Sequence, residues 1–142
     1  MRMALQEAQW ALEENEVPVG AVIVYQDRVI ARAHNGREQL HDPTAHAEMI
    51  VLREAAAKLG AHRLTDCDLY VTLEPCAMCA GAISHARLRR LYYAAPDPKG
   101  GAVEHGPRFF SQPTCLHAPE VYGGIREREA AAMLRAFFAS RR

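Results

Sequence analysis

Apolar residues recur at roughly helical spacing near the start of the chain. The positions that carry this pattern are Met3, Leu5, Ala8 and Leu12. They predict a first helix within residues 1–15. A second helix is predicted over residues 45–59, which are rich in Ala, Glu, Leu and Met and stop at Gly60, a residue typical of helix ends. Two more helices are predicted, one after Pro75, because proline suits a first helical turn, and one over residues 124–140.

Runs of apolar and β-branched residues predict strands between these helices. The stretch "VGAVIVYQDRVIARAHN" (residues 19–35) divides at Gln26 and Asp27 and predicts a hairpin. The stretch "DLYVTLE" (residues 68–74) is nearly continuous in apolar character, as a buried strand would be, and "RLRRLYYAA" (residues 87–95) predicts another strand. Strands that alternate with helices favour an α/β fold in which helices cover both faces of a sheet.

Length and composition favour one domain over residues 1–142. The chain has no internal repeat or low-complexity linker, and residues 96–118, with four prolines and three glycines, are predicted to be irregular. No apolar run approaches the roughly 18 residues that span a bilayer. The first residues lack the continuous apolar segment of a secretion signal, so we expect a cytoplasmic protein. The net charge of zero supplies no overall field for nucleic acid, so a polyanionic partner would need a local basic patch.

Two of the four cysteines, Cys76 and Cys79, lie three residues apart at the predicted helix start after Pro75. On a helix their side chains share one face, and a helix N-terminus favours the thiolate that binds metal. The spacing alone also allows a redox pair or two inert core cysteines. A structural four-cysteine zinc site is a weaker alternative, because Cys67 and Cys115 stand apart and form no second pair.

The segment "TAHAE" (residues 44–48) adds a third type of ligand. His46 lies 30 residues before Cys76, near another predicted helix start, so the two starts could meet at one zinc ion. Two sulfurs and one nitrogen leave the fourth tetrahedral position to water, as in catalytic zinc sites. Glu48 lies about 200° around a helix from His46, which is a poor position for a second ligand but suits an acid or base beside the water. The pattern "H-x-E…P-C-x-x-C" is typical of zinc deaminases.

Longer segments extend the likeness beyond the zinc motif. They are "EVPVGAVIV" (residues 16–24), "HDPTAHAEM" (41–49), "LYVTLEPCAMCAGAI" (69–83), "DPKGGA" (97–102) and "AFFASRR" (136–142). In kind and order they resemble the bacterial tRNA-specific adenosine deaminases of the cytidine deaminase-like superfamily. The resemblance covers most of the chain and implies a three-layer α/β/α sandwich with a mixed sheet of about five strands. It also implies a homodimer.

The resemblance further implies hydrolytic conversion of adenosine to inosine at the wobble position of a tRNA anticodon. His46, Cys76 and Cys79 would hold one Zn²⁺ per subunit, and Glu48 would shuttle protons while hydroxide attacks C6 of adenine and ammonia departs. Asn35 and Ala47 would bind the substrate, although a plain turn asparagine is an equal alternative for Asn35. After Ala102, the segment of residues 103–119 departs from the family pattern. The resemblance therefore defines the type of reaction more closely than the choice of substrate.

A basic stripe on the last predicted helix is the candidate contact for the tRNA anticodon arm. Three arginines recur every seven positions, Arg128, Arg135 and Arg142. Their candidate neighbours are Arg141, Phe137 and Phe138, of which at least one phenylalanine could stack on a base. The alternative is a solvated face with Phe137 in the core beside Ala130, Met133 and Leu134. Two other functions stay open: a deaminase of a free base or nucleoside such as cytosine or guanine, and a catalytically silent zinc-binding subunit that only docks RNA. The intact Glu48 argues against the second.

Overall fold

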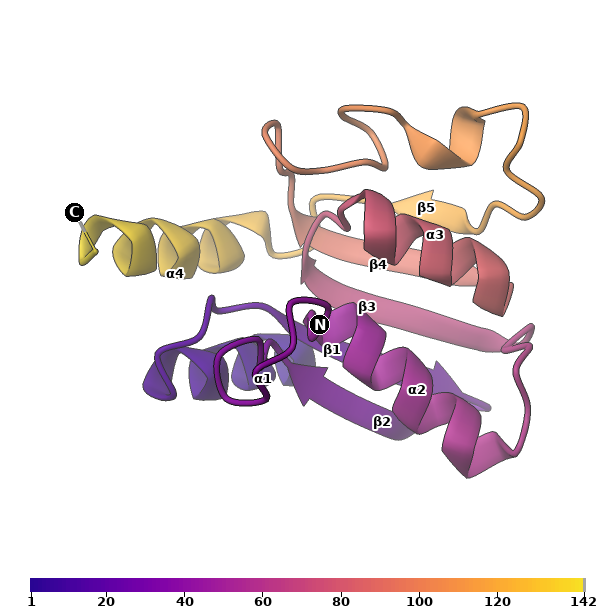
Figure 1. Ribbon diagram of the computed structural model, residues 1–142, viewed down its shortest axis with the longest axis horizontal. Coiled ribbons are helices and arrows are strands. Elements are labelled where there is room, and N and C mark those ends of the chain that lie inside the picture. The colour runs from indigo at the N-terminus through magenta and orange to yellow at the C-terminus, as the bar shows by residue number, and fades with distance from the viewer. Residues whose placement is uncertain (142) are drawn as a thin grey trace.

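A computed structural model describes residues 1–141 of the chain as five strands, four α-helices and one short 3₁₀ helix (Figure 1). The elements run in the order α1 (Arg2–Glu13), β1 (Gly20–Tyr25), β2 (Arg28–His34), α2 (Ala47–Leu59), β3 (Cys67–Leu73), α3 (Ala77–Ala86), β4 (Arg90–Ala95), η1 (Phe109–Ser111), β5 (Glu120–Tyr122) and α4 (Glu127–Ala139). Among the described residues, no helix has both the length and the apolar character that crossing a bilayer requires.

The five strands form one mixed sheet in the order β2-β1-β3-β4-β5. Strand β1 runs antiparallel to β2 and to β3, whereas β4 runs parallel to β3 and to β5. The predicted hairpin is confirmed: Gln26 and Asp27 join β1 to β2 with φ angles of 50° and 61°. Two successive left-handed residues are the backbone that a two-residue hairpin turn requires, because they match the twist of the flanking strands.

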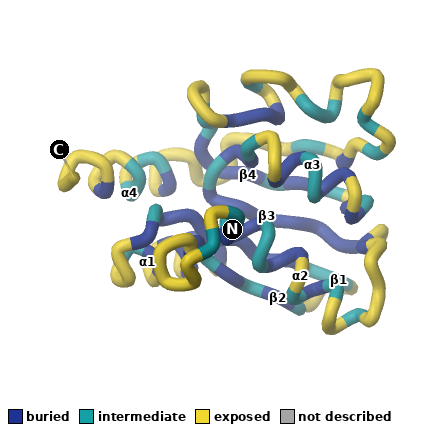
Figure 2. The backbone as a smooth tube through the Cα atoms, viewed as in Figure 1, coloured by how far each residue is buried: buried dark blue, intermediate teal, exposed yellow. Residues whose placement is uncertain are grey.

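Two helices cover each face of the sheet, which confirms the three-layer α/β/α prediction. Helices α2 and α3 contact each other and bury Val51 and Ile83 against Leu69 and Leu91 of the central strands. Helices α1 and α4 contact each other on the other side, where Leu5 packs with alanines of β4 and α4. Figure 2 shows the central strands β1, β3 and β4 as mostly buried, whereas each helix also has exposed stretches.

Strands β2 and β3 both run antiparallel to β1, so their carboxyl ends, which lead toward the starts of α2 and α3, lie at the same edge of the sheet. In α/β sheets, ligands bind beyond the carboxyl ends of parallel strands, since the loops there are free to carry functional groups. Strand β3 ends at Leu73 and leads through Glu74 and Pro75 into α3. The loop after β4, from Pro96 onward, begins at the same edge because β3 and β4 are parallel.

Three local expectations need correction. Pro75 lies before the N-cap residue Cys76 and not in the first helical turn, so it fixes the extended entry to α3. The second predicted helix begins at Ala47, two residues later than its composition indicated. The three-residue edge strand β5 lies between the predicted irregular segment and the predicted last helix, where no strand was predicted.

Candidate metal centre

His46 and Cys76 each occupy the residue at which an extended segment turns into a helix. His46 is the N-cap of α2, with φ −73° and ψ 150°, and Cys76 is the N-cap of α3, with φ −74° and ψ 177°. Cys79 follows in the first turn of α3 and is fully buried. The His46 Nδ1 atom lies 3.6 Å from Cys76 Sγ and 3.5 Å from Cys79 Sγ. The three ligand atoms all lie within 4.8 Å of one another.

These separations fit a tetrahedral zinc ion. A Zn–S bond of about 2.3 Å and a Zn–N bond of about 2.0–2.1 Å, at the tetrahedral angle, place sulfur and nitrogen roughly 3.6 Å apart. The observed nitrogen–sulfur distances of 3.5 and 3.6 Å therefore match the edges of a zinc tetrahedron. With three protein ligands, the fourth corner stays open to water or substrate, which distinguishes a catalytic site from a closed structural one.

The local electrostatics favour the metal-binding thiolate form of one ligand, Cys76. The hydrogen bond from Cys79, reinforced by His46, lowers the pKa of Cys76 to about 4, so this thiol is ionised at neutral pH. The same contact and burial raise the pKa of Cys79, so the pair retains one proton. Metal binding releases such a proton. Both helices begin at this point, and their N-terminal dipoles stabilise negative charge there.

The Glu48 side chain interacts with Cys79 but lies outside the group of three residues that could share an ion. Its side chain is 4% exposed, and burial is the largest cause that raises its pKa to about 7. The helical angle used to separate Glu48 from His46 does not apply, because His46 precedes the helix and has an extended backbone. A buried carboxyl that changes protonation near neutral pH can act as acid and as base, which is the property a proton shuttle needs.

The other two cysteines lie apart from this site. Cys67 is fully buried at the start of β3, and burial raises the pKa of its thiol to about 11, as in an inert core cysteine. Cys115 lies in the loop over α3, with its Sγ 3.1 Å from the carbonyl oxygen of His117. The described part of the chain therefore places no second cysteine pair at the metal centre, and a closed four-cysteine site is not formed.

Asn35 and Ala47 are joined by a hydrogen bond at the start of α2. The Ala47 amide donates to the Asn35 Oδ1 atom at 2.7 Å, and both residues are buried. Asn35 thus caps one of the free N–H groups of the helix, which is a structural use of its side chain. Asn35 also lines a cavity of about 370 Å³, whose wall includes Glu16, Arg37 and His41.

The predicted RNA contacts on α4 separate into buried and exposed residues. Phe137 is 5% exposed and borders the same cavity, with the Arg141 guanidinium 3.7 Å from the centre of its ring. Phe138, Arg128 and Arg135 are exposed. Arg142 lies outside the described residues. Ala130 is buried while Met133 and Leu134 are partly buried, so this helix packs one apolar side, Phe137 included, inward.

Comparison with known proteins identifies the chain. Residues 1–95 match the model of the cytidine and deoxycytidylate deaminase zinc-binding region. A tRNA-specific adenosine deaminase of Agrobacterium fabrum is 62% identical over 142 residues, covering 100% of this chain and 93% of the relative. The chain belongs to the tRNA-specific adenosine deaminases. A solved structure from a study of A-to-I editing by tRNA:A34 deaminases at the wobble position of transfer RNA matches with a TM-score of 0.93 and 63% identity, covering 94% of this chain and 97% of that one.

A neighbour outside the tRNA-specific adenosine deaminases shares the fold. The guanine deaminase of Nitrosomonas europaea matches with a TM-score of 0.80 and 27% identity, covering 97% of this chain and 83% of its own. The family identification thus supports zinc as the cofactor and agrees with the ligand geometry of His46, Cys76 and Cys79.

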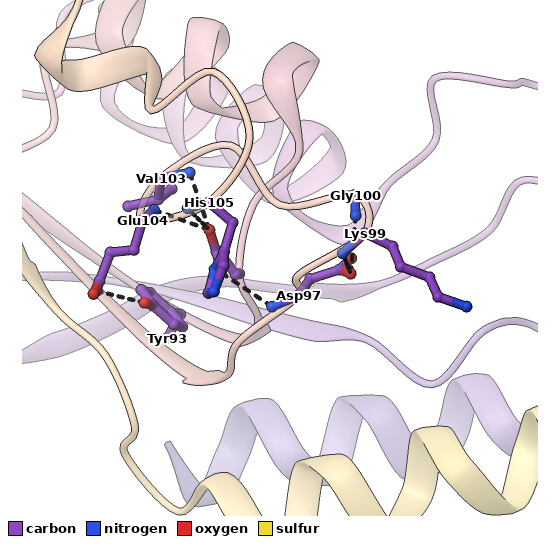
Figure 3. Close-up of polar contacts among 8 residues, drawn as sticks. Tyr93, Asp97, Lys99, Gly100, Val103, Glu104 and His105 are labelled. Atoms are coloured by element: carbon purple, nitrogen blue, oxygen red, sulfur yellow. Dashed lines mark hydrogen bonds and ion pairs between the residues drawn. The ribbon is translucent and has the colours of Figure 1, made fainter.

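Two buried carboxylates near the site of this tRNA-specific adenosine deaminase were not singled out from the sequence. Glu16 accepts hydrogen bonds from the amides of Glu38 and Gln39 at 3.3 and 2.8 Å, and it holds the loop that walls the cavity. Glu74, directly before Pro75, accepts hydrogen bonds from the loop after β4 (Figure 3). Both carboxylates occur inside segments quoted for the family, and their partners are mostly backbone amides, which leave no mark in a sequence.

Proposed function

We propose that residues 1–142 form a single zinc-dependent domain that hydrolyses adenosine to inosine at the wobble position of a tRNA anticodon. The observation that carries the proposal is the set of His46, Cys76 and Cys79 at zinc distances with the buried carboxyl of Glu48 beside them. The 62% identity to a tRNA-specific adenosine deaminase over the full chain supports the substrate. A tRNA substrate would place the protein in the cytoplasm.

In this proposal His46, Cys76 and Cys79 hold one zinc ion per subunit. Zinc, when bound, supplies the Lewis acidity that lowers the pKa of water so that hydroxide forms near neutral pH. Glu48 accepts the proton of the attacking water and delivers it to the adenine ring. It then takes the proton of the hydroxyl formed at C6 and passes it to the amino group, which leaves as ammonia, so adenosine and water yield inosine and ammonia. A carboxyl with a pKa of about 7 can take and give these protons at neutral pH.

Asn35 is our candidate for the group that orients the base. Its Oδ1 is held by the Ala47 amide at 2.7 Å, so the side chain is fixed beside the helix that starts at the metal centre. Ala47 contributes through this bond, since its own side chain is fully buried. A side chain locked by its neighbours loses little entropy on binding, which favours precise placement of the substrate.

The cavity beside Asn35 and the exposed side of α4 are our candidate surface for the anticodon arm. Arg141 lies over the ring of Phe137 at the cavity wall, and Phe138, which is 52% exposed, extends the aromatic surface. Arg128 and Arg135 are exposed on the same helix and are available to phosphates.

Incubation of the purified protein with four substrates separately tests the function. We expect inosine from tRNA or its anticodon arm, and no ammonia from adenosine, cytosine or guanine at the same concentration.

In the same assay, Arg135→Ala combined with Arg141→Ala is expected to raise KM for the RNA about tenfold and to weaken the dependence of KM on salt, because phosphate contacts release counterions. The exposed Gln9→Ala on α1 is the control.

The second candidate function is deamination of a free base, which the fold of the guanine deaminase neighbour favours. Ammonia release from guanine or cytosine without conversion of tRNA would replace the tRNA proposal and leave the zinc chemistry intact. No release from any of the four substrates, by protein that holds zinc, would instead favour the silent RNA-docking subunit.

We also propose a homodimer formed through the outer side of α2 and α3. These helices border a groove of about 530 Å³ whose lining is predominantly apolar and includes Met49, Leu52, Ala56 and Ala82. Met78, on the same α3 helix, is 37% exposed. An isologous contact between two copies would cover this surface on both, because a two-fold axis pairs the same patch with itself.

Ala82→Arg is expected to convert the protein from dimer to monomer. The substitution places a charge in the lining of the groove, where a second copy would bury it without a partner. Light scattering coupled to gel filtration gives the mass directly, and Gln9→Arg, on the exposed side of α1, is the matched control. A wild-type protein that elutes as a monomer at micromolar concentration, or a dimer that survives Ala82→Arg, would contradict this interface.

A further inference from the structure

Glu74 is a buried carboxylate between the last residue of β3 and the zinc-site helix. It lies two residues before Cys76, and its side chain has no exposed surface. Its backbone amide donates to the carbonyl oxygen of Ala95 at 2.8 Å, so the residue is tied to the end of β4. Glutamate is rarely buried unless its charge is satisfied. The proposed chemistry of His46, Cys76, Cys79 and Glu48 assigns it no part.

Five donors, all from one loop, surround the two oxygens of Glu74. Oε1 accepts from the amide of Asp97 at 3.0 Å and lies 2.7 Å from the His105 Nδ1 atom. Oε2 accepts from three successive amides, those of Val103, Glu104 and His105, at 3.1, 2.9 and 3.1 Å. Figure 3 shows the loop folded around these contacts. Hydrogen bonds to an ionised acceptor are roughly twice as strong as those between neutral groups. The Glu74 carboxylate therefore holds the surrounding loop in place.

The loop is shaped for this carboxylate and for the start of α3. A Cβ atom on Gly101 would lie 2.5 Å from Glu74 Cδ, so only glycine allows the backbone to approach so closely. The amide of Ala102 donates to the carbonyl oxygen of Pro75 at 2.9 Å, and the amide of Phe109 donates to Ala102 at 2.7 Å. The Phe109 ring then reaches α3, where a Cβ on Gly81 would lie 3.7 Å from it. Residues 97–109 are therefore fastened along the metal-bearing helix.

We infer that Glu74 is a positioning residue that fixes the loop of residues 97–105 against the start of α3 as one wall of the substrate site. The claim that the loop forms a wall of the substrate site rests on the proposed function. The claim that Glu74 anchors the loop does not depend on that function. The loop begins at the carboxyl end of β4, at the edge of the sheet where Cys76 begins α3, and it is held there by a side chain that cannot reach solvent. Without the carboxylate, four amides of the loop lose their acceptor.

Glu74→Gln tests the inference with little change in size. The amide nitrogen of glutamine donates and cannot accept, so the backbone amides that face it, one at the Oε1 position or three at the Oε2 position, lose their acceptor. We expect KM for the anticodon-arm RNA to rise about tenfold, kcat to fall less than about threefold, and zinc content to stay at one per subunit, because the loop would contact substrate away from the reacting atoms. Glu74→Asp, which keeps the charge on a shorter side chain, is expected to recover part of the KM.

Amide hydrogen exchange measures the anchoring without substrate, so it separates this inference from the proposed function. Exchange at Val103, Glu104 and His105 is expected to become about tenfold faster in Glu74→Gln, whereas amides of β1 and β3 keep their rates. Glu13→Gln, an exposed carboxylate on α1, is the control and should change neither readout. If Glu74→Gln does not fold, His105→Ala removes one donor of five and should give smaller shifts of both readouts in the same direction. Unchanged exchange and KM, or loss of zinc at unchanged KM, overturns the inference.

Discussion

Glu48→Ala is expected to retain one zinc per subunit and to lower kcat for tRNA deamination by about 10³-fold. The carboxyl is 4% exposed and lies beside the ligand atoms without joining them, so its removal takes away the proton carrier and leaves the metal's three ligands in place. The barrier to ring protonation and to loss of ammonia then rises, because water alone must supply the protons. Metal analysis of the purified variant and single-turnover formation of inosine measure the two effects separately.

Two further variants serve as comparisons for the activity of Glu48→Ala. Glu48→Gln keeps the size of the side chain and should lose a similar amount of activity, since an amide cannot shuttle protons. Glu54→Gln, a partly exposed carboxylate on the same helix that pairs with Lys58 at 3.7 Å, should keep full activity. Turnover at the wild-type rate by Glu48→Ala would assign the proton transfers to another group. Loss of zinc from that variant would make Glu48 a ligand and contradict the three-ligand site.

The parts of the fold and site that the sequence predicted are those encoded by side chains close together in the chain. Gln26 and Asp27 interrupt an apolar run and adopt the left-handed turn, so the pattern of apolar and polar residues predicted the hairpin. The metal centre could be predicted because its ligands lie in two short segments that each begin a helix. The angle argument for Glu48 failed because it assumed that His46 already lies within the helix, whereas an N-cap residue has an extended backbone.

The features that the sequence did not predict depend on backbone groups or on very short elements. Strand β5 has three residues and no alternation long enough to recognise, and it forms only because β4 offers a free parallel edge. The order of the loop around Glu74 comes from four backbone amides 23 to 31 residues away, and any residue except proline supplies such an amide. The helical position of Phe137 did not distinguish a core residue from an RNA contact. In the structure Phe137 is buried and also lies at a cavity wall.

Removal of one zinc ligand is expected to abolish both metal binding and activity. In Cys79→Ser one of the two sulfur ligands of the site is lost, and the two remaining ligand atoms, His46 Nδ1 and Cys76 Sγ, 3.6 Å apart, are too few to hold zinc firmly. We expect less than about 0.1 zinc per subunit, no measurable inosine, and a loss of about 4 kcal/mol from the free energy of unfolding if wild-type zinc is present at about 1,000 times its dissociation constant. Metal analysis, the tRNA assay and denaturant unfolding monitor the three quantities.

Cys115→Ser separates the metal centre from a general effect of losing a thiol. Cys115 is partly exposed and lies in the loop over α3, with its sulfur on the carbonyl oxygen of His117, so the same substitution there should keep zinc, activity and stability. Chelation of the wild-type protein should reproduce the Cys79→Ser behaviour, and added zinc should restore activity to the chelated protein but not to the variant, because only the variant lacks the ligand. Full zinc content in Cys79→Ser would mean that the metal is held elsewhere. Loss of zinc from Cys115→Ser as well would show that the nitrogen–sulfur distances around His46 do not define the site.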